Sequence, residues 1–397
     1  MLERLEEFFP ASVDHSLLFV ISCLLMLGLI MVYSASLPLP SDNERHLFWN
    51  QMRGHPLHLL IGVIVLGLFL LIPTDVLKSF SGLLFTFGLA LLFCVGLLKF
   101  FGGQEYIRDG AVRSIPIGSI TVQPAELVKF FSILFASAYA IRRNDRIRGS
   151  LIQGIAPIGF LMVILITLLL YQPDLGSTIV ITLTVGAILF LGGMNLKVFM
   201  PLFFGLCSFF VLMIVNTPWR LGRLVSFVTP CDQEFSATSG YQLCAALVAF
   251  GNGGLSGTGL GTGVAKLDYL PLPHTDFIFA VIGEELGFVG VSIVLIGFYY
   301  LIKRSIEIGR TAMSQDRVFA GLVAQGIGFW IGVQAFIHAG VNTGILPTKG
   351  LTLPFISHGG SSMIVVCAAM GVLLRIDMEN KFYSKSEPTY INKNSNG

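Results

Sequence analysis

Long stretches without a charged residue dominate this sequence and restrict what it can fold into. A helix needs about 20 mostly apolar residues to cross a bilayer. A stretch from Gln123 to Ile141 is interrupted only by Glu126 and Lys129. Nine others lack Asp, Glu, Lys and Arg and meet or nearly meet this length: 16–41, 54–74, 79–98, 149–173, 175–196, 198–219, 286–302, 318–348 and 350–374. Only 12% of the residues are charged, about half the fraction usual in soluble domains, so we predict an all-α, polytopic membrane protein with ten transmembrane helices.

The distribution of Lys and Arg sets the predicted orientation. Ten helices put both termini on one side, and a cytoplasmic N-terminus gives the inner segments 15 Lys and Arg against nine outside. Both termini are therefore expected in the cytoplasm. The predicted layout is a single transmembrane domain at 1–375, with a long extracytoplasmic loop at 217–273 and a polar cytoplasmic tail at 376–397. The net charge is +2, and no basic tract suggests a nucleic-acid partner.

The long loop contains a short apolar segment and a glycine run. Tyr241–Phe250 is too short to span a membrane, so we expect a re-entrant or interfacial helix. The run at 251–263 has seven glycines, but no strand precedes it and no Gly-Lys-Ser/Thr ends it. We therefore predict a flexible loop that moves over a ligand, in preference to a phosphate-binding loop. Cys231 and Cys244 share this loop and could form a disulfide if the loop is extracytoplasmic, but no spacing rule supports the pair, so the sequence favours unpaired thiols and leaves the pairing open.

Three carboxylates follow one another in His274–Gly287, which reads HTDFIFAVIGEELG. Carboxylates on a membrane helix are costly unless they are paired or lie in an aqueous cavity. Helical rotation puts Asp276 above a seam of small residues, formed by Ala280, Gly283, Gly287 and Gly290. Glu284 and Glu285 lie deeper on other faces, so we expect them to be structural. Their candidate partners are the polar row Gln334, His338 and Asn342.

A second polar group is predicted around an intramembrane lysine. Lys129 lies about 7.5 Å into its helix and needs a partner. Glu126 is three residues earlier on the same face, and Asp174 begins another span. We favour a Lys129–Asp174 pair, with Glu126 nearby, as the support of a polar cavity. A purely structural buried pair is the alternative.

Three helix starts are predicted to face the outer leaflet, near Gln123, Gln172 and Thr275. Proline in the first turn, as in both Gln-Pro pairs, favours a helix start. Helix N-termini attract anions, so these ends suit a lipid headgroup with a pyrophosphate, although ordinary capping uses the same residue types. A metal site is not expected, because His274 and Asp276 are too few ligands and the other histidines are scattered. The stretch Ser357–Ser362, SHGGSS, is interpreted as a helix-packing device.

Five motifs in one order resemble a known family. They are QPAELVK, QPDLG, GYQ followed by the glycine run, LPLPHTDFIFAVIGEELG and PTKGLTLPFISHGGSS. Together they resemble the SEDS family (shape, elongation, division and sporulation), from the first span to about Arg375. The stretch PTKGLTLPF is similar to the cell-division branch of that family and less similar to its rod-elongation branch. Departures from the family pattern include Leu272, Ser114 and His358.

The resemblance implies a ten-helix glycosyltransferase that polymerises lipid II into β-1,4 glycan strands and releases undecaprenyl pyrophosphate. It places the essential aspartate at Asp276, the lysine and its acidic partner at Lys129 and Asp174, and the loop arginine at Arg113. It also implies a class B penicillin-binding protein, the division transpeptidase, and other divisome membrane proteins as partners. The implied location is the inner membrane at the division septum.

In the resulting hypothesis Asp276 is the general base, and no residue of the protein is a metal ligand. The leaving pyrophosphate is balanced by a divalent cation (Mg²⁺ or Mn²⁺), by helix N-termini, or by basic residues: Arg113, Arg220, Arg223 and Lys349. Glu126 and His274 are supporting residues of this site. A lipid II flippase, an inactive scaffold and a rod-elongation polymerase are the alternatives.

Overall fold

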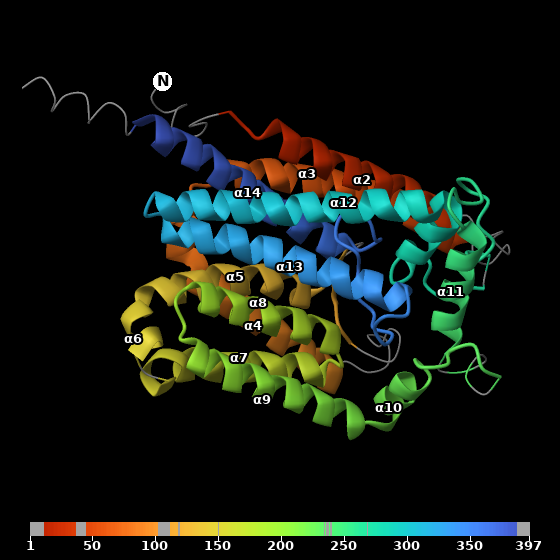
Figure 1. Cartoon of the computed structure of the whole chain (residues 1–397), viewed down its shortest axis with the longest axis horizontal. Helices are drawn as coiled ribbons and strands as arrows, with labels where there is room; N and C mark the ends of the chain where they lie inside the picture. Colours follow the sequence, from red (N-terminus) through yellow and green to blue (C-terminus); the bar gives the residue numbers. More distant parts are fainter. Residues whose placement is uncertain are drawn as a thin grey trace, which may run out of the picture.

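The chain folds almost entirely into helices (Figure 1). This computed structural model describes residues 12–36, 45–101, 112–117, 120–149, 151–233, 235, 238, 240–267 and 269–386. Its main helices are α2 (His15–Ala35), α3 (Arg45–Leu71), α4 (Thr74–Phe101), α5 (Pro124–Arg142), α7 (Ala156–Tyr171), α8 (Leu175–Leu191), α9 (Leu196–Val215), α12 (Ile278–Ser314), α13 (Val318–Asn342) and α14 (Gly360–Ser386). The connections contain β1 (Ile115–Ile117), β2 (Ile120–Val122), α6 (Asn144–Gly149), the π-helical turn η2 (Leu151–Ile155), α10 (Pro218–Val225) and α11 (Tyr241–Gly253).

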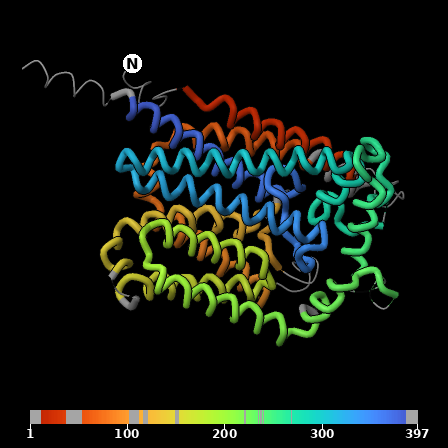
Figure 2. Tube along the Cα trace, viewed as in Figure 1, coloured from red at the N-terminus to blue at the C-terminus, as the bar shows by residue number. Residues whose placement is uncertain are grey.

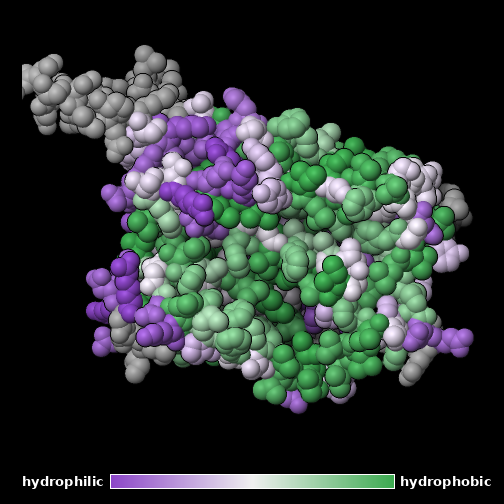
Figure 3. Space-filling view, in the orientation of Figure 1, coloured by the Kyte–Doolittle hydropathy of each residue, from purple (hydrophilic) through white to green (hydrophobic). Residues whose placement is uncertain are grey.

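The predicted membrane architecture is confirmed. Among the described helices, nine are long and apolar enough to cross a membrane, and α8 is a tenth, shorter apolar helix. Figure 3 shows a broad apolar band across the molecule, with hydrophilic residues gathered towards the ends of the helices. This is the surface expected where a bilayer surrounds the middle of a helix bundle. Which end faces the cytoplasm stays a prediction.

The later part of the chain occupies the centre of the bundle. Helices α12 and α13 pack side by side, with α2 against α12 and with α5 and α8 against α13 (Figure 2). Helix α14 packs against α3, and α4 packs against α5. Helix α11 stands across the end of the bundle at which α12 begins (Figure 1). The segments that carry the predicted site therefore meet at the centre of one end.

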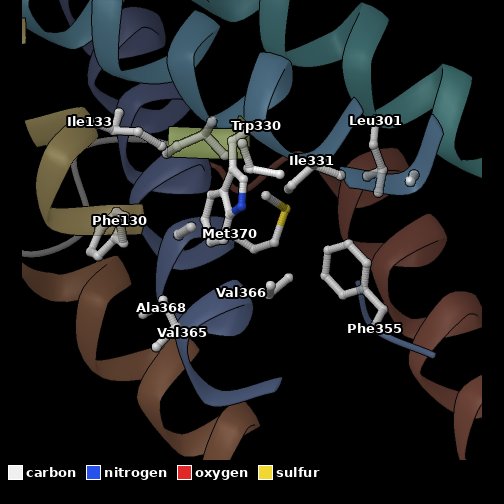
Figure 4. Packing of buried hydrophobic residues seen from close by; sticks show 14 of the residues in the cluster. Phe130, Ile133, Leu301, Trp330, Ile331, Phe355, Val365, Val366, Ala368 and Met370 are labelled. Atoms are coloured by element: carbon white, nitrogen blue, oxygen red, sulfur yellow. The ribbon is translucent and has the colours of Figure 1, made fainter. Parts of the chain in front are cut away.

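A tryptophan marks the core below this end. Trp330 of α13 is 1% exposed and lies among Phe130 and Ile133 of α5 and Met370 of α14 (Figure 4). Its indole Nε1 donates to Gln334 Oε1 at 2.9 Å, which satisfies the only polar atom of the ring. A buried residue of this size contributes about 3–5 kcal/mol to stability. This packing gives the polar groups above it a rigid base.

An ion-pair network closes the opposite end of the bundle. Arg304 of α12 donates to Asp14 at 2.6 Å and to Asp377 of α14 at 3.2 Å. Burial raises the pKa of Asp14, but hydrogen bonds from Ser16, the Leu17 amide and Arg304 outweigh it and lower this pKa to about 2. The network therefore joins three helices, and the lowered pKa keeps the carboxylate of Asp14 ionised at neutral pH.

The C-terminal span begins and ends later than predicted. The sequence suggested a span at 350–374 and a tail from residue 376, whereas α14 runs from Gly360 to Ser386. Asp377, Glu379 and Asn380 are buried, because they pair with basic and polar groups of neighbouring helices. Residues 343–359 instead form an irregular connection that contains Pro347 and Pro354. Residues 387–397 of the predicted tail lie outside the described part of the chain.

The glycine run is bound to a break in α12. Gly287 has φ 65°, and the peptide groups freed there bond to the loop: Phe288 N donates to Gly254 O at 2.9 Å, and Thr258 N donates to Glu284 O at 2.9 Å. A Cβ at Gly287 would lie 2.3 Å from Gly257 N, so the close approach requires glycine. In this structure the run is thus a packing partner of α12, and it does not line the cavity described below.

Cys231 and Cys244 form a disulfide, with their Cα atoms 5.1 Å apart. Of the two alternatives that the sequence left open, the structure has the disulfide and not the favoured unpaired thiols. The chain folds back before α11, where Gly240 N donates to Phe235 O at 3.0 Å and Cys244 N donates to Gly240 O at 2.9 Å. This turn, which no cysteine spacing rule reveals, brings the two thiols together.

Candidate functional site

A polar cavity of about 350 Å³ lies where α5, α8 and α14 begin. Four of the charged residues singled out from the sequence line it, namely Arg113, Glu126, Asp174 and Asp276. They come from four separate parts of the chain, so only the tertiary structure brings them together. Most of the remaining wall is formed by the irregular segment before α14 and by the first turn of that helix.

Asp276 lies in a turn that precedes α12, not on the helix face that the periodicity suggested. Three successive carbonyls of this turn accept hydrogen bonds from other elements. His274 O accepts from His358 N at 2.9 Å. Thr275 O accepts from Ser357 Oγ at 2.7 Å, and Asp276 O accepts from Asn342 Nδ2 at 3.0 Å. The backbone of Asp276 is therefore fixed, and its half-buried side chain faces the cavity.

The space beside the Asp276 carboxylate depends on a glycine. A Cβ at Gly350 would lie 3.0 Å from Asp276 Oδ2. This is closer than ordinary contact, so a larger residue would displace the carboxylate.

The predicted seam of small residues is present further along α12. Gly283 faces Phe250 of α11, where an added Cβ would approach that ring to 2.3 Å.

Lys129 pairs with Glu126 and not with Asp174. Lys129 Nζ lies 2.8 Å from Glu126 Oε1 and 3.2 Å from Gln334 Oε1, and the lysine is 2% exposed. Asp174 instead caps α8, where its Oδ1 accepts from Ser177 N at 3.0 Å. The favoured Lys129–Asp174 pair is thus wrong, because a helix cap already engages Asp174. Glu126 Oε2 has no hydrogen-bond partner among the described residues.

Three helix N-termini converge on the cavity. Gln123 and Asp174 are the N-caps of α5 and α8, as the Gln-Pro pairs suggested, and both line the cavity. The third is α14, which begins at Gly360. Ser361 links α14 to α5, because its Oγ accepts from Gln123 N at 2.9 Å and donates to Thr121 O at 3.0 Å. Such ends present partial positive charge and favour bound anions.

Arg113 is the basic side chain of the cavity wall. It is largely exposed, and its Nη2 and Nε lie 3.2 and 3.4 Å from the carbonyls of Pro173 and Gln172. These contacts hold the guanidinium over the start of α8. Lys349 adjoins the wall residue Gly350, but neither Lys349 nor Arg223 of α10 lines the cavity. Arg220 also belongs to α10, and its side chain lies outside the described part of the structure.

The two glutamates of α12 hold the long loop in place. Glu285 pairs with Lys266 at 2.7 Å and accepts from Ser34 of α2, and Glu284 accepts from the amides of Val264 and Ala265. Their predicted structural role is confirmed, but their predicted partners are wrong.

The polar row of α13 instead contacts groups around the cavity. Gln334 contacts Lys129, and His338 contacts the Leu351 carbonyl. Asn342 contacts the Asp276 carbonyl.

The stretch SHGGSS was not recognised as part of the site. His358, Gly359, Gly360, Ser361 and Ser362 all line the cavity, so this stretch forms part of the site in addition to its predicted role in packing. They follow an irregular segment with a proline and begin a helix, and serines at a helix start are a capping signal. His274, also predicted to support the site, stacks edge-on against His358 with 5.8 Å between the ring centres. Burial lowers the pKa of His274.

Comparison with known proteins identifies relatives along nearly the whole chain. The model of the cell cycle protein family of FtsW, RodA and SpoVE matches residues 14–382. A probable peptidoglycan glycosyltransferase FtsW of Polynucleobacter necessarius is 43% identical over 372 residues, which cover 93% of this chain and 86% of the relative. A protein of the same description from Burkholderia thailandensis is 41% identical over 371 residues, 93% of this chain and 79% of the relative.

A solved structure has the same fold. It comes from work on the structural coordination of polymerization and crosslinking by a peptidoglycan synthase complex. The superposition has a TM-score of 0.71 at 24% sequence identity and covers 93% of this chain and 98% of the other.

Proposed function

The chain belongs to the family of the cell cycle proteins FtsW, RodA and SpoVE, and from this premise we propose how it acts as a peptidoglycan glycosyltransferase at the cavity around Asp276. The single observation that carries the proposal is the position of this aspartate. Three hydrogen bonds to successive carbonyls fix its turn, and its side chain faces a polar cavity ringed by three helix N-termini. A carboxylate held in this way is positioned to accept a proton from a bound hydroxyl.

In the proposed reaction Asp276 removes the proton from the 4-hydroxyl of the acceptor's N-acetylglucosamine. The hydroxyl oxygen forms a bond to the anomeric carbon of a second lipid-linked sugar. The bond from that carbon to the phosphate oxygen breaks, and undecaprenyl pyrophosphate leaves with the electron pair. The linkage changes from α to β-1,4. General-base assistance of this kind contributes about 10²–10⁴ in rate.

A single catalytic carboxylate is sufficient for this reaction. A glycosidase needs a second one to protonate a poor leaving group, whereas a pyrophosphate leaves without a proton if its charge is balanced. Arg113 and the N-termini of α5, α8 and α14 surround the cavity and supply this positive potential. Lys129 neutralises Glu126, so this acidic residue adds little repulsion.

A divalent cation, Mg²⁺ or Mn²⁺, is one candidate for balancing the charge of the leaving pyrophosphate. The cavity offers three carboxylates, but Lys129 holds Glu126 and the first turn of α8 holds Asp174. The described His, Cys, Asp and Glu side chains form no group of three or more arranged to bind an ion. The protein alone therefore does not provide a fitting site for this cation, and no reaction step above depends on it.

The proposed substrate is lipid II, and the proposed location is the inner membrane at the division septum. This assignment follows the relatives described as FtsW and the sequence similarity to the cell-division branch. The proposed partners are the nascent glycan strand, a class B penicillin-binding protein that acts as the division transpeptidase, and other divisome membrane proteins. The solved relative comes from a complex that combines polymerization with crosslinking, which supports a partner of this kind.

The decisive experiment is polymerisation of lipid II by the purified protein, with and without the cognate transpeptidase. Asp276→Asn removes the base but keeps the shape of the side chain, and should reduce glycan synthesis about 10²-fold or more. The matched control is Asp75→Asn. Asp75 is an exposed aspartate in the first turn of α4 and does not line the cavity, so this variant should retain activity. Glycan chains made at the normal rate by Asp276→Asn would contradict the proposed base. Movement of lipid II across vesicles without polymerisation would favour a flippase instead.

A further inference from the structure

An apolar groove of about 540 Å³ lies between α7, α8 and α9. Among the described residues that line it, only Thr182 has a polar side chain, and its hydroxyl donates to Thr178 O at 2.6 Å. None of the twenty residues of α9, all of which the structure describes, is buried. An apolar cavity does not hold water, so within a bilayer the occupant of this groove is a hydrocarbon chain.

The groove lies in the half of the bundle that is remote from Asp276. Helix α8 begins at the polar cavity with its N-cap Asp174, and its first groove residue is Thr182, about 12 Å further along the helix. On α7 the groove residues end at Ile166, in the half of that helix near α6 (Figure 1). A lipid chain that enters here therefore belongs to the leaflet opposite to the polar cavity. With the predicted orientation, this is the cytoplasmic leaflet.

A basic cluster lies at the same end of the bundle. It consists of four arginines at the end of α5 and on α6, namely Arg142, Arg143, Arg146 and Arg148. No described carboxylate, not even Asp145 of α6, forms an ion pair with this cluster. Arg304 and Arg317, at the same end, are paired with carboxylates. The charge of the basic cluster is therefore left for an anion from outside the protein.

Two arginines of the basic cluster border the end of the groove. Arg143 Nη1 donates at 3.1 Å to Gln153 O of η2, the segment that leads into the α7 wall of the groove. A Cβ at Gly193 would lie 3.0 Å from Arg148 Nε, so this guanidinium lies over the turn between α8 and α9. The next residue of that turn, Met194, lines the groove. Positive charge thus stands on both sides of the groove end.

The short helix that carries these arginines is held in place. A Cβ at Gly154 would lie 2.4 Å from Arg146 O, so the backbone of α6 touches that of η2. Arg146 and Arg148 are exposed, and a guanidinium has five N–H donors, so both can bind a phosphate. Figure 3 shows hydrophilic residues at this end, next to the apolar surface around α7 and α9.

We propose that the groove and the basic cluster together bind one anionic phospholipid. Its phosphate lies against Arg143 and Arg148, and one acyl chain lies along the groove between α7 and α9. Charge complementarity selects an anionic lipid, because basic sites between transmembrane helices favour anionic headgroups. The bound chain packs α9 against α7 and α8.

The position of the groove argues against the chain of the lipid-linked substrate as its occupant. The substrate pyrophosphate is proposed to lie at the polar cavity, whereas the basic cluster lies at the other end of the bundle. One headgroup cannot occupy both places. The phospholipid site is therefore separate from the proposed reaction, and its binding can be measured without lipid II.

The first test uses the full-length protein in detergent, freed of lipid and analysed by native mass spectrometry. The probes are dioleoyl phosphatidylglycerol, which is anionic, and dioleoyl phosphatidylcholine, which carries no net charge. One phosphatidylglycerol per chain should be retained, and it should raise the unfolding temperature, whereas phosphatidylcholine should do neither.

Charge variants test the headgroup site. Each basic residue near a membrane surface contributes about fivefold to the binding of an anionic lipid. Arg143→Gln combined with Arg148→Gln should therefore weaken phosphatidylglycerol binding about twentyfold. Arg310→Gln, which changes an exposed arginine of α12, is the matched control and should bind as the unchanged protein does.

A groove variant tests the chain site. A Cβ at Gly159 would meet no atom within 4 Å, so Gly159→Leu fills the groove without a clash. Each buried methylene contributes about fourfold, so the loss of two weakens phosphatidylglycerol binding about tenfold. Gly205 of α9 has the same open space but does not line the groove, and Gly205→Leu should retain binding.

Three results would overturn the proposal. Equal binding of the two phospholipids would show ordinary contact with bilayer lipid. Unchanged phosphatidylglycerol affinity in the double arginine variant would place the headgroup elsewhere. Undecaprenyl phosphate that binds more tightly than phosphatidylglycerol, and loses this binding in Gly159→Leu, would assign the groove to the substrate chain.

Discussion

Asn342 of α13 holds the turn of Asp276 against the first turn of α12. Its Nδ2 donates to the Asp276 carbonyl at 3.0 Å, and its Oδ1 accepts from Ala280 N at 3.1 Å. The same amide therefore fixes the residue proposed as the base and adds a second acceptor to the Ala280 N–H, which also donates to Phe277 O at 3.0 Å. The aspartate owes its position to a side chain more than sixty residues away.

Replacement of Asn342 should reduce catalysis more than substrate binding. Asn342→Ala removes the hydrogen bond to the Asp276 carbonyl and one of the two acceptors of the Ala280 amide, which destabilises the protein by about 1 kcal/mol. We expect kcat for lipid II polymerisation to decrease about tenfold or more with little change in KM, because the base is less well held. Asn216→Ala, at the exposed end of α9, is the control and should change neither quantity. A variant with full kcat would show that Asn342 is only structural.

Gly350→Ala should impair the site without unfolding the protein. The added Cβ would lie 3.0 Å from Asp276 Oδ2, so the carboxylate has to move by a few tenths of an ångström. Polymerisation should decrease about tenfold while the unfolding temperature changes little. Gly205→Ala in α9 has no atom within 4 Å of the added Cβ and should retain activity. Equal activity of the two variants would contradict the close approach.

The buried pair of Lys129 and Glu126 can be tested by a double-mutant cycle. Lys129→Met leaves an uncompensated carboxylate in the bundle and should lower the free energy of unfolding by about 3–5 kcal/mol. Glu126→Gln in the same chain should restore most of this loss, because no buried charge then remains. Asp174→Asn combined with Lys129→Met should restore little of the lost stability. Thermal unfolding in detergent measures the stability of all three variants. Rescue by Asp174→Asn would support the Lys129–Asp174 pair instead.

The buried imidazole of His358, which lies beside the rings of His55 and His274, predicts an acid-sensitive stability. The pKa of His358 is about 3 in the folded protein, whereas an unperturbed histidine titrates near 6.5. Between these values the unfolded chain binds a proton that the folded chain does not. The stability is therefore greatest above about pH 6.5 and is lost as the pH falls towards about 3. Lowering the pH from about 7.5 to about 5.5 should decrease the free energy of unfolding by about 1 kcal/mol through His358 alone.

His358→Asn should remove this part of the acid sensitivity, because asparagine does not titrate. Thermal unfolding at both pH values provides the measurement. His15→Asn, at the exposed start of α2, should leave the pH dependence unchanged. An equal loss of stability on acidification in the His358→Asn variant would assign the effect to other groups.

The sequence alone determined the membrane architecture and the approximate place of the site. A bilayer requires about 20 apolar residues per span, and the periodicity of a helix depends only on nearby residues, so the spans and the Gln-Pro helix starts could be read directly. The costly carboxylate of HTDFIFA identified Asp276 because a charge in an apolar setting stands out without any knowledge of its neighbours.

Only the tertiary structure decided the partners of these groups. Glu126 and Asp174 were both plausible partners of Lys129 by type, and the choice depended on whether Asp174 was already engaged as a cap of α8. The start of α14 in the cavity wall, the disulfide between Cys231 and Cys244 and the contact between the rings of His55 and His358 depend on segments that are distant in the chain. The physical reason is that hydrogen bonds and ion pairs act over about 3 Å, and the sequence does not give the distances between segments that are remote in the chain.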